Sequence, residues 1–411
     1  MRLPVPRSGL IYWIAAAAFV LRVAARLAQG IGNFWVNGYS FFFDLAQSIA
    51  AGRGFSLPNG VPTAFRVPLY PILLAGLTLG HPWFWPIVIA ESLMGAATCI
   101  CAALLARQMY PGERGRTAGL LAAAVTAVYP YYVVHDTALQ ETSLFTLLTL
   151  AAVLLALRVA RCGLLLPAAS CGFVLGLDVL TRSPIAPFAL LVPLWLIARR
   201  RVPQGLLCAL LLGLAVSPWL IRSFLLTGRP ALTTEAGFEL WNGNNPELFR
   251  FYPMQSIDVS IAANLAALPA RDQQQLARLG DNEAVIDRWY RQKALRYMRA
   301  HPWLTFTSGL RKIAAAFDWL PTPRRSRAQA LAHLLSFAPV MLLGLWGMWQ
   351  RRAQWRDDSL IYLLFAQFLI VTAVYFGQTN HRVFLDVYLI AFAAGAVVPE
   401  PRSKLGIPAR P

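Results

Sequence analysis

Apolar residues occur along this chain in long runs, which are separated by short polar stretches rich in arginine. We interpret ten of these runs as membrane helices, since a helix needs about 20 mostly apolar residues to cross a bilayer. Their approximate bounds are 9–28, 84–106, 117–134, 140–158, 163–180, 184–198, 205–226, 329–349, 358–376 and 383–398. The pattern predicts an all-α polytopic membrane protein with about ten transmembrane helices.

The stretch from about 30 to 82, which follows the first run, has a different pattern. It combines an aromatic cluster with Asp44 and Arg66, and its apolar part, about 67–80, is short and contains two prolines. We predict short juxtamembrane helices here, the last of them re-entrant or interfacial. In the helix around Asp44, we expect Phe41, Phe42, Leu45 and Ile49 to face lipid and Asp44, Gln47 and Ser48 to face the protein.

The distribution of Lys and Arg orients the predicted helices, because cytoplasmic loops carry an excess of both. Arg2 and Arg7 place the N-terminus inside, and the basic tail after 400 places the C-terminus inside. Ten crossings then put the dense arginine clusters on the cytoplasmic side, except for the cluster at 323–327. The loop 30–82 and the long polar segment 228–326 are predicted to be external, hence periplasmic in a bacterial inner membrane.

The segment 228–326 is the one sizeable polar part of the chain. Residues 282–299 place apolar side chains at a helical period, and His301-Pro302 is expected to end that helix. We predict a small, mainly helical cap over the membrane part. The chain accordingly divides into a core with its first external loop (1–227), the periplasmic segment (228–326) and C-terminal helices with a basic tail (327–411).

Composition supports this interpretation. The 411 residues are 57% hydrophobic and 14% charged, whereas soluble domains contain about 25% charged residues. The net charge of +18 would suggest a nucleic-acid partner in a soluble protein, but here the arginines lie between apolar runs, so we expect no nucleic-acid binding. The five cysteines lie in or beside apolar runs, which predicts buried thiols instead of disulfides or a metal site.

Ionisable and amide side chains gather in the predicted external loops, where charges beside membrane helices usually mark function. Asp44 is a candidate general base toward a hydroxyl, and solvated surface aspartate is the alternative. Four arginines are candidates for clamping a phosphate, with interfacial snorkelling as their alternative: Arg66, Arg182, Arg222 and Arg382. Asn244 and Asn245 offer amides for a sugar or phosphate, although such residues are first of all turn formers.

A divalent metal is an open alternative to a metal-free site. His135 and Asp136, with Glu141 or His381, supply suitable ligand types, but their spacing matches no compact ligand motif.

Several segments, in this order, resemble the GT-C membrane glycosyltransferases, specifically bacterial relatives of protein O-mannosyltransferases and of the lipid A aminoarabinose transferase. The segments are LAQSIAAGRGF, PTAFRVPLYP, QETSLFTLLTLAAVLL, GLDVLTRSP, SPWLIRSFLLTGRP, GFELWNGNNP, AVIDRWYRQKALRYMRAHPW and NHRVFLDVYLIAFAAG. The resemblance implies an inverting transfer of a sugar from a polyprenyl-phosphate donor, at the periplasmic face, to a lipid, glycan or protein hydroxyl. The residues that match family positions best are Glu141, Arg182, Arg222 and Arg382, and His381 directly precedes the last of them.

The resemblance also shows one departure. Such enzymes usually carry an aspartate in the first external loop at a position that is near Gly38-Tyr39 here, and the nearest carboxylate is Asp44. Three possibilities follow. Asp44 serves as the base through a shifted loop, Asp136 or Glu141 serves instead, or the chain has lost its transfer activity. The last possibility defines the alternative function, a non-catalytic polyprenyl-lipid-binding protein or flippase on the same scaffold.

Overall fold

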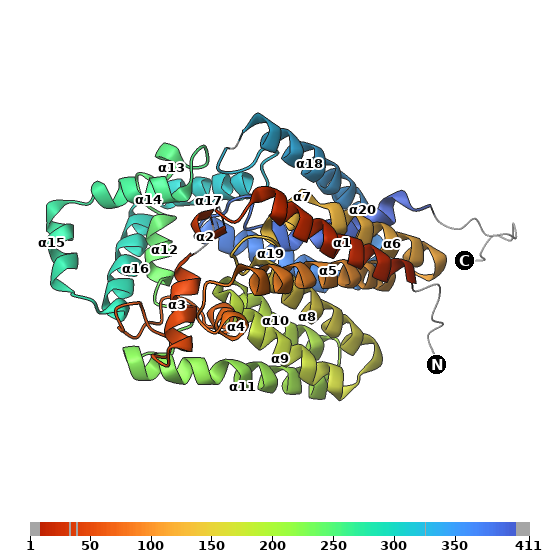
Figure 1. The fold of residues 1–411 in the computed structure, drawn as a ribbon, viewed down its shortest axis with the longest axis horizontal. Helices are drawn as coiled ribbons and strands as arrows, with labels where there is room; N and C mark the ends of the chain where they lie inside the picture. Colours follow the sequence, from red (N-terminus) through yellow and green to blue (C-terminus); the bar gives the residue numbers. More distant parts are fainter. Residues whose placement is uncertain (1–8, 33, 38–39, 325, 400–411) are drawn as a thin grey trace, which may run out of the picture.

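The computed structural model describes residues 9–32, 34–37, 40–324 and 326–399. Within these residues the secondary structure is helical apart from one isolated bridge between Ser56 and Pro62. The main helices pack side by side into an elongated bundle (Figure 1). They are α1 (Gly9–Gln29), α5 (Phe84–Met109), α6 (Gly112–Val128), α8 (Thr142–Cys162), α9 (Leu165–Thr181), α10 (Ala186–Ala198), α11 (Val202–Thr227), α18 (Arg327–Gln350), α19 (Ser359–Val374) and α20 (Val383–Val397).

These bounds confirm the predicted helical runs, with one difference. The run predicted as one helix over 117–134 is divided at Tyr129 into α6 and the short α7 (Pro130–His135). The backbone of Tyr129 is extended, as expected for a residue before proline, where the proline ring disfavours the helical conformation. The division lets the chain turn before Asp136. A 3₁₀ turn, η1 (Ser183–Ile185), similarly precedes α10, and another, η2 (Arg352–Gln354), follows α18.

The centre of the bundle is α20, whose side chains from Val383 to Gly395 are all buried. Helix α18 packs closely against it at two glycines. A Cβ added to Gly347 would lie 2.3 Å from the Phe392 carbonyl oxygen, and one added to Gly344 would lie 3.0 Å from that of Leu389. The bundle is therefore built on close helix contacts between small residues, as is typical of membrane proteins.

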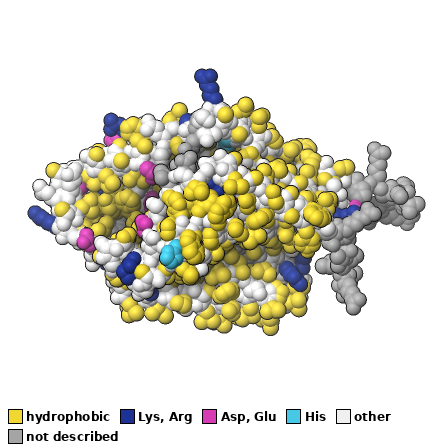
Figure 2. All heavy atoms as spheres, viewed as in Figure 1, with side chains coloured by type: hydrophobic (Ala, Val, Ile, Leu, Met, Phe, Trp, Pro, Cys, Tyr) yellow, Lys and Arg dark blue, Asp and Glu magenta, His cyan; other side chains and the backbone are white. Residues whose placement is uncertain are grey.

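The outer surface of the bundle is hydrophobic, as in a protein embedded in lipid. On α11, Leu206, Leu210 and Leu214 recur every fourth residue and are each more than half exposed. On the face shown in Figure 2, a broad hydrophobic surface separates the charged side chains near α12–α16 from a few at the other end. Among the described helices, α1, α5, α8, α11 and α18 are long and apolar enough to cross a membrane. The chain is a multi-pass membrane protein, and the count of ten crossings stays a prediction.

The first loop forms the short helices α2 (Phe34–Asn37), α3 (Ser40–Ala50) and α4 (Leu69–Thr78). Ten residues of α4 rise about 15 Å, half of the hydrocarbon thickness, so α4 does not span a membrane alone. One prediction for α3 is wrong: Phe42 and Leu45 are buried within the protein, while Gln47 is exposed. These two side chains pack against protein because α4 covers α3, and they lie in hydrophobic clusters that also include residues of α5.

The segment 228–326 lies at one end of the bundle, opposite the end where α1 begins and α20 ends (Figure 1). Its helices are α12 (Ala236–Asn242), α13 (Leu248–Phe251), α14 (Ile257–Ala266), α15 (Ala270–Arg278), α16 (Glu283–Ala300) and α17 (Pro302–Ala316). The predicted helix over 282–299 is confirmed as α16. The Asn282 side chain caps its start by accepting a hydrogen bond from the Val285 amide, and His301-Pro302 ends it. Gly38-Tyr39, Arg2, Arg7 and the basic tail lie outside the described residues.

Candidate active site

Two arginine–carboxylate pairs meet at the end of the bundle that faces the segment 228–326. Arg66, just before α4, lies with its Nη1 2.9 Å from Oε1 of Glu235, which directly precedes α12. Glu141, which directly precedes α8, lies with its Oε1 3.1 Å from Nε of Arg182, which directly follows α9. The charge of Glu141 contributes to raising the pKa of Glu235, so the two pairs are neighbours. We call these four residues the paired-arginine site.

The carboxylates of this site are buried and have unused hydrogen-bonding capacity. Burial raises the pKa of Glu235 to about 8, and Arg66 offsets only part of that effect. Burial also raises the pKa of Glu239, one turn further along α12. The Oε2 atoms of Glu141, Glu235 and Glu239 have no hydrogen-bond partner within the described residues. Because buried polar atoms are normally paired, these oxygens are suited to accept hydrogen bonds from the hydroxyl groups of a ligand.

Aromatic rings position the two arginines. The Cζ atom of Arg66 lies 5.6 Å from the ring centroid of Phe65 and 6.0 Å from that of Phe42, and Arg182 lies 5.3 Å from the ring of Phe145. Such contacts hold a guanidinium through its face and leave its edge donors directed elsewhere. Both cations are therefore fixed in place by packing as well as by their carboxylate partners.

Asp44 lies on α3, the helix that also carries Phe42. Its side chain is half-buried and forms no ion pair with any described residue. Burial raises its pKa above the ordinary value for an aspartate. A carboxylate without a cationic partner is available to accept a proton, which keeps Asp44 a candidate base.

His381 joins the site from the turn between α19 and α20. Burial, with the charges of Arg182 and His135, lowers the pKa of its imidazole to about 3. The imidazole is therefore neutral at physiological pH and can form a hydrogen bond without adding charge beside Arg182.

Two further predicted residues, Asp136 and Arg222, have internal partners. The Oδ2 atom of Asp136 lies 2.8 Å from Nε of Arg22 on α1, and both side chains are almost fully buried. Arg222 donates hydrogen bonds to the carbonyl oxygens of Phe55 (2.6 Å) and Thr63 (2.9 Å). It thereby attaches the first loop to α11.

Arg382 is fully buried next to α18. Its Nε lies 3.3 Å from Oδ1 of Asp386, and its Cζ lies 3.3 Å from the ring centroid of Phe337. Tyr129 donates a hydrogen bond to the other oxygen of Asp386. Among the arginines predicted to clamp a phosphate, Arg66 and Arg182 thus lie at the paired-arginine site, whereas Arg222 and Arg382 fill internal contacts.

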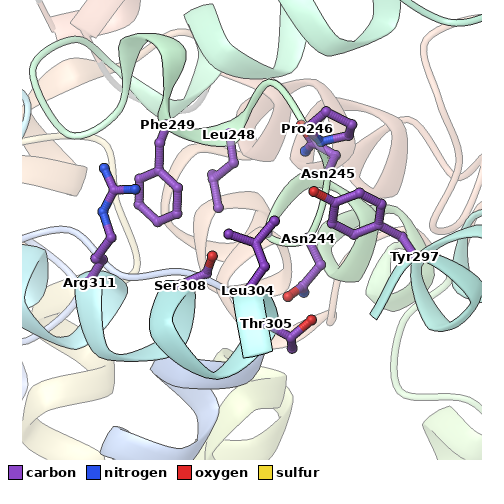
Figure 3. A pocket seen from close by; sticks show the side chains of 11 residues that line it. Asn244, Asn245, Pro246, Leu248, Phe249, Tyr297, Leu304, Thr305, Ser308 and Arg311 are labelled. Carbon is purple, nitrogen blue, oxygen red and sulfur yellow. The ribbon is translucent and has the colours of Figure 1, made fainter. Parts of the chain in front are cut away.

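Asn244 and Asn245 follow α12 and border a separate pocket of about 170 Å³ (Figure 3). The Asn244 amide donates to the carbonyl oxygens of Leu240 and Val374, and the Asn245 amide donates to those of Trp241 and Asn242. Their amide donors are used within the protein, as expected for residues that fix a turn.

Sequence reasoning missed Glu91, Glu235 and Glu239. Glu91 is buried on α5, where it accepts a hydrogen bond from the Tyr70 hydroxyl of α4. It is an isolated carboxylate in an apolar run, a signal that could have identified it. Glu235 and Glu239 carry no such signal, because they lie in a polar stretch where a solvated carboxylate is the ordinary expectation.

The residues considered for a divalent metal do not form a ligand group. The Nδ1 atom of His135 lies 3.0 Å from the side-chain oxygen of Gln140, and Asp136 pairs with Arg22. No group of three or more His, Cys, Asp or Glu side chains that could hold a metal occurs in the described ranges.

Part of this chain matches a known protein family. Residues 67–221 match the model of the dolichyl-phosphate-mannose-protein mannosyltransferase family. No curated protein sequence matches the chain. The crystal structure of ArnT from Cupriavidus metallidurans bound to undecaprenyl phosphate aligns with 95% of this chain and 78% of its own, with 14% sequence identity and a TM-score of 0.40. Over residues 67–221, which contain Glu141 and Arg182, the resemblance of this chain to the GT-C membrane glycosyltransferases is confirmed.

Proposed function

We propose that this chain transfers a sugar from a polyprenyl-phosphate-linked donor to a hydroxyl group of a lipid, glycan or protein acceptor. The observation that carries the proposal is the family match over residues 67–221, because the matched range supplies half of the paired-arginine site. The family is named for a dolichyl-phosphate-linked sugar donor, and dolichyl phosphate is a polyprenyl phosphate. A site with two fixed cations suits the phosphate of such a donor.

Arg66 and Arg182 are the proposed phosphate ligands. Each guanidinium presents several N–H donors in a planar fork that matches phosphate oxygens. Glu235 and Glu141 would hold these forks in position before the donor enters. The unpartnered oxygens of Glu141, Glu235 and Glu239 would then form hydrogen bonds with the hydroxyl groups of the sugar.

The proposed chemical step needs one general base. Asp44 or Glu141 removes the proton of the acceptor hydroxyl while its oxygen forms a bond to the anomeric carbon. The bond from that carbon to the phosphate oxygen breaks on the opposite side, so the configuration inverts and the polyprenyl phosphate leaves with the electron pair. Asp136 is the weakest of the three candidate bases, because it pairs with the fully buried Arg22, whereas Oε2 of Glu141 has no hydrogen-bond partner within the described residues.

The reaction would take place at the periplasmic face of a bacterial inner membrane. The paired-arginine site lies at the end of the bundle next to the segment 228–326, which the arginine distribution places outside. In this proposal 1–227 form the catalytic core, 228–326 form a periplasmic cap, and 327–411 complete the membrane part with both termini in the cytoplasm.

The test uses the full-length protein reconstituted in liposomes with a radiolabelled polyprenyl-phosphate-sugar and an acceptor extract. We expect Glu141→Gln or Asp44→Asn to reduce transfer by about 100-fold or more. Glu247→Gln is the matched control, because Glu247 forms a surface pair with Arg250. If both Glu141→Gln and Asp44→Asn kept full turnover, the base assignment would be wrong. Binding of the donor without any transfer by the parent protein would instead favour the non-catalytic lipid-binding protein or flippase.

A further inference from the structure

Helix α17 lies at the boundary between the bundle and its cap. It packs along the end of α19, an apolar helix, where a Cβ added to Gly309 would lie 3.4 Å from the Cβ of Ala373. Lys312 donates hydrogen bonds to the carbonyl oxygens of Val374 and Tyr375, at the end of α19. If α19 lies in the hydrocarbon layer, this part of α17 lies at the level of the lipid headgroups.

The exposed side of α17 has the composition of a lipid-facing surface. Trp303, Phe306 and Leu310 are spaced at helical intervals of three and four residues and are each more than half exposed. Tryptophan is enriched where protein meets the membrane–water interface. Leu304, on the same helix, borders the pocket of Figure 3, so the apolar surface leads directly to that pocket.

The pocket is lined by a cation, Arg311, that has no anionic partner among the described residues. Arg311 lies at one end with its Cζ 3.7 Å from the ring centroid of Phe249, and within the described residues it forms no ion pair or hydrogen bond. The hydroxyl groups of Ser308 and Tyr297 likewise have no hydrogen-bond partner there. Figure 3 shows Ser308 between Arg311 and Leu304, and Tyr297 at the opposite end. The pocket thus has donors at both ends, with Arg311 and Ser308 on one side and Tyr297 on the other.

The size and chemistry of this space identify a ligand class. A cavity volume of about 170 Å³ is several times the roughly 10–15 Å³ that one water needs by the same measure, and accommodates a phosphate group. The Arg311 guanidinium and the Ser308 hydroxyl, three residues apart on α17, are donors suited to phosphate oxygens. The neighbouring Trp303, Phe306 and Leu310 would add an apolar surface that a soluble anion does not need.

We propose that this pocket binds the phosphate group of an anionic phospholipid, whose acyl chains lie against the apolar side of α17. The proposal is independent of glycosyl transfer, since the pocket lies beyond the C-terminal end of α12 and Glu235 lies before its start. A bound lipid would fix α17, and with it the cap, at the membrane surface.

Native mass spectrometry of the full-length protein in a neutral detergent, titrated with phosphatidylglycerol, phosphatidylcholine or inorganic phosphate, tests this proposal. We expect preferential binding of phosphatidylglycerol and an affinity about tenfold lower in Arg311→Gln, as for the loss of a hydrogen bond to a charged group. Arg299→Gln, an exposed position outside the pocket lining, should bind as the parent protein does, and Arg311→Gln should retain sugar transfer.

Equal affinity of Arg311→Gln and the parent protein for phosphatidylglycerol would overturn the proposal, as would an equal loss in Arg299→Gln. Inorganic phosphate that binds as tightly as the lipid, and displaces it, would show a soluble-anion site and contradict the lipid assignment.

Discussion

Glu235 is subject to two opposing influences, because burial favours the neutral acid whereas Arg66 favours the carboxylate. Burial dominates, and the pKa in the folded protein is about 8 compared with an ordinary 4.5. The folded state therefore retains a proton between these two values that the unfolded state has lost. The resulting contribution to the free energy of unfolding is fully present below about pH 4.5 and is lost as the pH rises to about 8.

Replacing this carboxyl group is expected to remove that pH dependence. Glu235→Gln cannot titrate, so its melting temperature should fall less than that of the parent protein between pH 5 and pH 8. Thermal unfolding in detergent measures the difference, and Glu247→Gln should reproduce the parent profile. Parallel curves for Glu235→Gln and the parent protein would show that Glu235 does not titrate in this range.

Gly95 on α5 provides a second prediction for a single residue. A Cβ at this position would lie 2.2 Å from Oδ2 of Asp136 and 2.3 Å from Nε of Arg22, distances at which the buried pair cannot persist. We expect Gly95→Ala to destabilise the protein by about 3 kcal/mol, the lower range for breaking a buried ion pair. Gly213→Ala on α11 is the matched control, because an added Cβ there meets no atom within 4 Å. Equal melting temperatures for the two variants would contradict this role of Gly95.

Among the structural elements, the first loop is fixed by two others that are distant in sequence. Arg222 of α11 binds the carbonyl oxygens of Phe55 and Thr63. Glu283, at the start of α16, accepts hydrogen bonds from the Ala64 amide at 3.0 Å and from the hydroxyl groups of Thr63 and Thr234. The loop that carries Arg66 to the paired-arginine site thus depends on both α11 and α16.

Loss of either contact should make this loop more mobile. In Arg222→Gln and Glu283→Gln we expect trypsin to cleave after the exposed Arg53 several times faster than in the parent protein. The reason is that the backbone must open locally before it can enter the active site of a protease. Release of the N-terminal fragment, followed by mass spectrometry, measures the rate. Arg278→Gln, on α15, should have no effect. An unchanged rate in both loop variants would mean that other contacts fix this loop.

The bounds of the long helices could be predicted because runs of apolar residues are local information, and so is the end of α16 at His301-Pro302. The direction in which α3 faces could not be predicted from the sequence. The later helix α4 packs along α3, where Tyr70 contacts Phe42, and no residue within α3 specifies that packing. The division at Tyr129 was visible in the Tyr129-Pro130 sequence, but the apolar run across it favoured one continuous helix.

At the scale of the whole molecule, the sequence indicated which loops carry the charged residues but not their pairing. Arg66 and Glu235 are 169 positions apart, and Arg22 and Asp136 are 114 apart. The local sequence pattern contains no information on which residues pair over such long separations along the chain. Arg66 and Arg182 were predicted and lie together, whereas Arg382 had the same appearance in the sequence and is fully buried beside Asp386.

The bundle also makes a prediction about orientation that depends on the whole chain. Cys162 is exposed at the end of α8 that lies away from Glu141, and Gln274 is exposed on α15 in the segment 228–326. If that segment is periplasmic, a membrane-impermeant maleimide should label Gln274→Cys in intact spheroplasts but label Cys162 only after permeabilisation. The double variant Cys101→Ser, Cys162→Ser provides the background for the first measurement, since Cys101 is partly exposed and the remaining Cys99, Cys171 and Cys208 are buried. Labelling of Cys162 in intact spheroplasts, with Gln274→Cys protected, would reverse the orientation and place the paired-arginine site at the cytoplasmic face, where a periplasmic acceptor could not reach it.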